Sequence, residues 1–73
     1  RDVAVLFSNR ALARFLQNKF VESLADADEC IRLQSSFLKG HFHRVRALLA
    51  LGPDRADEAQ RAFWRGLEAA NGS

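Results

Sequence analysis

Residues 20–33 read FVESLADADECIRL, and this stretch decides the fold. Phe20, Leu24, Ala27 and Ile31 recur at spacings of three and four residues, whereas the acidic residues fall outside this stripe. An apolar stripe with this period is typical of an amphipathic α-helix that buries one face. Because a helix of this length is not stable alone in water, the sequence predicts a helix over 20–33 that packs against neighbouring helices.

Turn-forming residues divide the chain into three further helical segments, about 3–16, 37–51 and 55–70. These turns are Gln17-Asn18, Gln34-Ser35-Ser36 and Gly52-Pro53-Asp54. Loops this short place consecutive helices side by side and antiparallel, which predicts an all-α fold of four antiparallel helices. Apolar stripes in the first and last segments are Val3, Phe7, Ala11 and Phe15, and Ala56, Ala59, Phe63 and Leu67.

Polar residues stand where helix caps are expected. Asp2 precedes the first helix, Ser35 or Ser36 precedes the third, and Asp54 precedes the fourth. Their side chains can accept hydrogen bonds from the first free amides of each helix. Asn18 tolerates the left-handed conformation that ends a helix, so we expect it to close the first one.

The chain also repeats itself. A shift of 34 residues superposes Asn9-Arg10 on His43-Arg44, and a shift of 36 residues superposes the second helix on the fourth. Self-similarity of this period is typical of a solenoid rather than a closed bundle. We therefore expect two repeats, 4–37 and 38–73, with a two-residue insertion near 52–54.

Packing residues recur in phase in the two repeats: Ser23, Ala27 and Cys30, then Ala59, Phe63 and Gly66. With residues 8–11 and 20–27, which look like its two helices, they resemble the tetratricopeptide-repeat family over essentially the whole chain. The sequence departs from the family pattern at Ser35, where a proline is usual, and at Arg10 and Arg14, which replace apolar residues. The resemblance implies two tandem helix-turn-helix units in a short right-handed α-solenoid that binds other proteins.

Residues 28–33 and 37–40 resemble the co-chaperone subset that binds the acidic C-terminal tails of heat-shock chaperones. By that resemblance, Asn9 and Lys39 match a carboxylate clamp, and His43 stands where the clamp has arginine. A neutral histidine carries no charge, so it would assist mainly when protonated. We expect the segments 3–16 and 37–51 to be the inner helices, which line a concave groove. Eight residues on them are expected to face this groove and bind a peptide: Val5, Ser8, Asn9, Leu12, Lys39, Phe42, His43 and Arg46.

The residue types argue against catalysis, metal binding and a membrane span. Neither a Ser/His/Asp set nor a glycine-rich phosphate loop is present, so we expect no enzyme activity and no cofactor. His41 and His43 project to opposite sides of a helix and cannot chelate one metal ion, and Cys30 on an apolar stripe is a packing thiol. No apolar run approaches the roughly 18 residues that span a bilayer. We expect a reducing compartment, the cytoplasm or the nucleus, and a chain that is a segment of a longer protein.

Two alternatives to peptide binding remain. The net charge of +2 is spread along the chain, but a nucleic-acid module would use Arg10, Arg14, Arg44 and Arg46. The other alternative is a structural segment that packs on flanking domains. Phe63 turns Trp64 away from the core, so we expect Trp64 to be partly exposed and able to form a homodimer contact.

Overall fold

Four helices form the fold in the computed structural model, which describes residues 3–71. They are α1 (Val3–Leu16), α2 (Phe20–Leu33), α3 (Leu38–Leu51) and α4 (Ala56–Ala70), with a 3-10 turn, η1 (Pro53–Arg55), before α4. The predicted all-α fold is confirmed. The predicted bounds of α1 and α2 agree with the structure, while α3 and α4 each begin one residue later than expected.

The helix ends confirm one of the predicted caps and show that others are wrong. Asn18 has a φ of 64°, the left-handed conformation expected after α1. Phe37 precedes α3 instead of a serine, and its side chain forms no capping hydrogen bond. Asp54 lies inside η1, because Pro53 starts a tight turn there, and α4 also begins without a side-chain cap. The predicted cap Asp2 lies outside the described residues.

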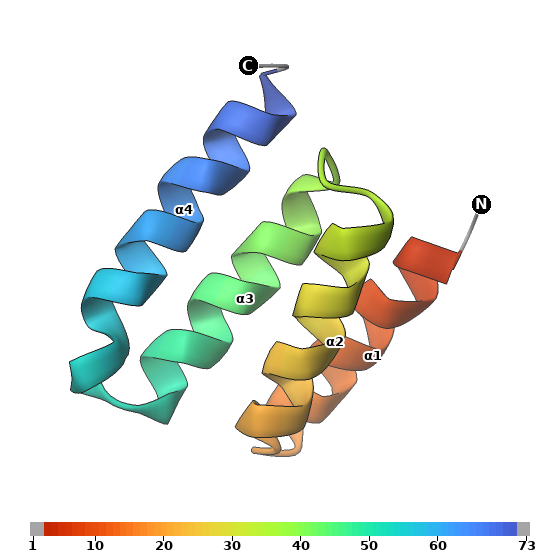
Figure 1. Cartoon of the computed structure of the whole chain (residues 1–73). Coiled ribbons are helices and arrows are strands. Elements are labelled where there is room, and N and C mark those ends of the chain that lie inside the picture. Colours follow the sequence, from red (N-terminus) through yellow and green to blue (C-terminus); the bar gives the residue numbers. More distant parts are fainter. Residues whose placement is uncertain (1–2, 72–73) are drawn as a thin grey trace.

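The helices form two antiparallel hairpins arranged as an open array (Figure 1). Helix α3 packs against α2 and α4 and also meets α1. Within residues 3–71, no Cα atom of α4 lies within 8 Å of a Cα atom of α1 or α2. A closed four-helix bundle would bring the first and last helices together, so this arrangement is that of two tandem repeats.

Small residues form the buried helix faces. The buried residues of α1, α2 and α4 are Ala4, Ser8 and Ala11; Ser23, Asp26, Ala27 and Cys30; and Ala59, Ala62 and Gly66. Small side chains allow the helix axes to come close together, and larger residues then lie at the flanks of each contact. The predicted stripes are therefore partly wrong, because Val3, Ala56 and Phe63 are exposed at these flanks.

Two glycines lie where α3 approaches α2 and α4 closely. A β-carbon added to Gly40 would lie 2.9 Å from the Sγ atom of Cys30 on α2. A β-carbon added to Gly66 would lie 2.6 Å from the β-carbon of His41 on α3. Both distances are shorter than van der Waals contact, so a larger residue at Gly40 would displace the Cys30 side chain, and one at Gly66 would push α3 and α4 apart.

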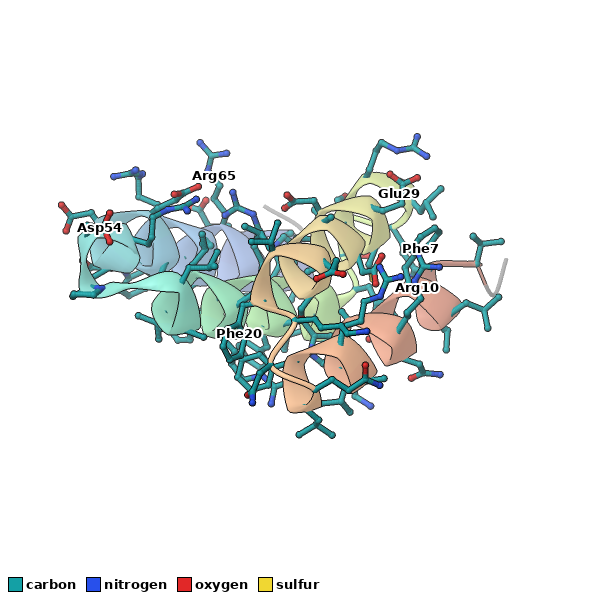
Figure 2. The ribbon with its side chains drawn as sticks, turned by 90° about the horizontal axis from the view of Figure 1, so that it is seen from below. Phe7, Arg10, Phe20, Glu29, Asp54 and Arg65 are labelled. Atoms are coloured by element: carbon teal, nitrogen blue, oxygen red, sulfur yellow. The ribbon has the colours of Figure 1, made fainter. Side chains whose placement is uncertain are left out.

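A buried aspartate joins α2 to α1. The Asp26 carboxylate accepts hydrogen bonds from Nε and Nη2 of Arg10, at 3.0 and 2.9 Å, and from Nη1 of Arg14 at 3.1 Å. Arg10 also lies over the ring of Phe7, and Figure 2 shows these two side chains together on α1. These arginines replace apolar residues of the family pattern, and the structure gives the reason: they neutralise a carboxylate in the α1–α2 contact.

Replacing Asp26 with asparagine should lower the free energy of unfolding by about 1–3 kcal/mol, because charge-assisted hydrogen bonds to a buried group are lost. Chemical denaturation monitored by circular dichroism measures this difference. Asp28→Asn is the matched control, since Asp28 is exposed and pairs with Arg44 at the surface, and such pairs contribute less than about 1 kcal/mol. Equal losses in the two variants would contradict a structural role for the buried carboxylate.

Candidate functional site: a pocket between α1 and α3

A pocket of about 470 Å³ opens between the two inner helices. This volume lies within the usual range for ligand sites, about 300–1,000 Å³. Seven of the eight residues predicted from the sequence line it: Ser8, Asn9, Leu12, Lys39, Phe42, His43 and Arg46. The structure also places Val45 and Phe63 in its wall. We call this feature the α1–α3 pocket.

Val5, the eighth predicted residue, does not line the pocket and is 41% exposed. Phe63 was expected in the core, but it is 39% exposed and stacks on Phe42, with ring centroids 6.2 Å apart. Trp64 meets the edge of Phe63 and is 57% exposed, as expected for this residue. The sequence has no local signal that pairs Phe42 with Phe63, because they come from different helices.

The pocket is positively charged. Lys39 and Arg46 line it, and no carboxylate does. Among the described residues, neither cation forms an ion pair with an acidic side chain. Asn9 adds an exposed amide that can both donate and accept hydrogen bonds. Two cations beside an aromatic wall can hold a ligand that carries both carboxylate and apolar groups.

The surroundings of His43 disfavour the charged role that the sequence suggested for it. It is only 8% exposed, and its Nε2 atom lies 3.0 Å from the Ser8 hydroxyl. Burial lowers the pKa of His43, and the positive charges of Arg46 and Lys39 lower it further. The neutral imidazole is therefore favoured, and a histidine cation in place of the clamp arginine is not.

Arg46 is held in place at the edge of the pocket. Its Nη2 atom lies 2.8 Å from Nδ1 of His43. Its guanidinium carbon lies 4.9 Å from the centre of the Phe15 ring, which is a cation–π geometry. Because Phe15 comes from α1, Arg46 bridges the two inner helices.

The other arginines proposed for a nucleic-acid module are engaged elsewhere. Arg10 and Arg14 bind the Asp26 carboxylate. Arg44 pairs with Asp28 at 2.7 Å and with Glu58 at 3.3 Å. Three of the four arginines thus have acidic partners, and the structure does not assemble them into a basic stripe.

The remaining candidate residues serve in packing. His41 is buried and its Nε2 atom lies 2.7 Å from the Ser35 carbonyl oxygen. Cys30 is buried, and burial raises the pKa of its thiol, which disfavours the reactive thiolate. Within residues 3–71, no group of three His, Cys, Asp or Glu side chains is placed to hold a metal ion. None of the described helices is long and apolar enough to cross a membrane.

Comparison with known proteins agrees with the two-hairpin architecture. The chain is 38% identical over 65 residues to human DnaJ homolog subfamily C member 7, and 38% identical over 64 residues to yeast heat shock protein STI1. It is 36% identical over 67 residues, 92% of its length, to human TPR and ankyrin repeat-containing protein 1. The chain belongs to the tetratricopeptide-repeat family. No family model matches it, and no solved structure does.

The similarity covers a repeat module and not whole proteins. The match spans 89% of this chain but 13% of the human DnaJ homolog, and 88% of this chain but 10% of STI1. The tetratricopeptide repeats account for the paired hairpins and for the small residues between them.

Proposed function

We propose that this domain is a noncatalytic protein-interaction module that binds an acidic peptide segment in the α1–α3 pocket. One observation carries the proposal: Lys39 and Arg46 line the same pocket as Asn9, and no carboxylate lies there to neutralise them. Phe42 and Phe63 supply an apolar surface beside these polar groups. The peptide therefore carries a carboxylate next to an apolar side chain.

A chaperone tail is the first partner to test. Two of the relatives are named as a heat shock protein and as a DnaJ homolog. The acidic C-terminal tail of a heat-shock chaperone also has the charge that complements Lys39 and Arg46. Such a partner places the module in the cytoplasm or the nucleus.

Titration with synthetic peptides tests this proposal. An acidic peptide with a free C-terminal carboxylate should bind more tightly than the same peptide with an amidated C-terminus, as measured by fluorescence anisotropy. Lys39→Ala should weaken binding of the free-carboxylate peptide about tenfold, the loss expected for one charge-assisted hydrogen bond. Lys19→Ala is the control, because Lys19 is exposed and lies outside the pocket.

The proposal fails if the peptide does not bind, or if neither the free carboxylate nor Lys39 alters its affinity. Steep dependence on salt together with binding to RNA would favour the nucleic-acid alternative instead. The engagement of Arg10, Arg14 and Arg44 with carboxylates makes that outcome the less expected one.

A structural role is the second candidate function, and exposed apolar residues favour it. Leu6 on α1 and Trp64 on α4 are largely exposed. In repeat arrays, such faces are covered by neighbouring repeats or by flanking domains. A second copy of the chain could also cover Trp64. Sedimentation at several protein concentrations distinguishes a homodimer from a monomer with an exposed tryptophan.

A further inference from the structure

We infer that Arg46 is the residue that pairs with a ligand carboxylate in the α1–α3 pocket, and that neutral His43 is its positioning residue. The inference rests on the proposed function, because it assigns roles within the same peptide site. It replaces the direct role that the sequence suggested for His43 with an indirect one.

The hydrogen bonds of His43 define its tautomer. A guanidinium can only donate hydrogen bonds. Because Nη2 of Arg46 lies 2.8 Å from Nδ1 of His43, Nδ1 must be the acceptor. The proton of a neutral imidazole then resides on Nε2, which donates to the Ser8 hydroxyl at 3.0 Å. Ser8 on α1 thus fixes the ring, and the ring in turn fixes Arg46.

Charged groups around His43 favour this neutral form. On its own helix, the neighbouring charges are Lys39 and Arg46, and both lower the pKa of His43 after the larger effect of burial. From α1, the pocket receives the uncharged Ser8 and Asn9, and from α4 it receives Phe63.

Carboxylates on the two helices that flank α3 are engaged in other contacts. Asp26 on α2 pairs with Arg10 and Arg14, and Glu58 on α4 pairs with Arg44 and Arg55. No acidic group therefore lines the pocket to stabilise a histidine cation.

Restricting the Arg46 side chain before the ligand arrives favours binding. A long arginine side chain loses conformational freedom when it binds a carboxylate, and this loss reduces the affinity. Here the ring of Phe15 and Nδ1 of His43 already restrict the guanidinium. His43 uses one donor of Arg46, and the planar fork has further N–H groups for a carboxylate.

An isosteric pair of variants tests the positioning role. Asparagine and leucine have a similar branched shape, but only asparagine has an oxygen close to the place of the histidine Nδ1. His43→Asn should retain affinity for the free-carboxylate peptide to within about threefold, whereas His43→Leu and Arg46→Ala should each weaken it about tenfold. The double variant His43→Leu/Arg46→Ala should bind no more weakly than Arg46→Ala alone, because the two changes remove the same interaction.

A purely structural role of His43 would give a different pattern. Both variants lose the hydrogen bond to Ser8, so their affinities would then fall together and follow thermal stability. Equal loss of affinity in His43→Asn and His43→Leu, or additive losses in the double variant, would overturn the inference while leaving the proposed function intact. Absence of peptide binding to the wild type would overturn both.

Nuclear magnetic resonance of the free protein tests the geometry without a peptide. Ring ¹⁵N shifts should show the Nε2–H tautomer of His43, with a pKa below its ordinary value of 6.5. In Arg46→Ala this pKa should rise, because a neighbouring positive charge is removed. An Nδ1–H tautomer, or a pKa that Arg46→Ala leaves unchanged, would overturn the inference even if the peptide binds.

Discussion

Replacing Gly66 with valine should lower the free energy of unfolding by about 2–3 kcal/mol, the cost expected for overpacking a close helix contact. The β-carbon alone would lie 2.6 Å from the β-carbon of His41, which is attached directly to the α3 backbone and cannot rotate away. The two helices of the second hairpin would have to separate. A domain of this size should then melt roughly 8–24 °C lower, as measured by circular dichroism.

The control for this prediction is Gln60→Val. Gln60 is exposed on α4, so the same β-branched side chain costs only a few tenths of a kcal/mol there through helix propensity. Gly66→Val should therefore be much less stable than Gln60→Val. Similar melting temperatures for the two variants would show that α3 and α4 do not pack as closely as described.

Reversing both charges of the pocket should abolish peptide binding. In Lys39→Glu/Arg46→Glu, an acidic ligand would meet two carboxylates in place of two cations, and like charges across an interface cost several kcal/mol. The affinity for an acidic peptide with a free carboxylate should fall by more than about 100-fold, which corresponds to about 2.7 kcal/mol. Isothermal titration calorimetry measures the difference.

A double variant with the same change in net charge serves as the control. Arg61 and Arg65 are exposed on α4 outside the α1–α3 pocket, and Figure 2 shows Arg65 projecting away from the helix. Arg61→Glu/Arg65→Glu should alter peptide affinity only by the small long-range effect of charge, which salt screens. If peptide affinity falls by the same factor in both double variants, the peptide is attracted by overall charge and not by the pocket.

Local sequence patterns were sufficient to predict the helices. The apolar period of residues 20–33 and the turn residues around it specify α2, and Asn18 has the left-handed conformation expected at the end of α1. The caps were less predictable. Ser35 and Asp54 have the right chemistry, but the chain enters α3 through Phe37, and Pro53 diverts the start of α4 into a 3-10 turn. Several residues near each turn can cap a helix, and tertiary packing selects among them.

The sequence predicted most of the residues that line the pocket, but not the contacts between helices that shape it. The resemblance to the clamp motif placed Asn9 and Lys39 on the inner helices, and the structure brings them to one pocket. Helical periodicity did not indicate that Phe63 would leave the core, because that outcome depends on the small residues of α3 and α4 and on how close the helices come. Nor did it show that His43 would bind Ser8, since this contact joins two helices whose separation is fixed only in the folded chain.

The most direct test of the central claim is a two-dimensional ¹H–¹⁵N magnetic resonance titration of the wild-type domain with the free-carboxylate acidic peptide. If the α1–α3 pocket is the binding site, the largest shifts should occur at Asn9, Leu12, Lys39, Phe42 and Arg46. Shifts concentrated instead around Arg61 and Arg65 on α4, or no shifts at saturating peptide, would contradict the account.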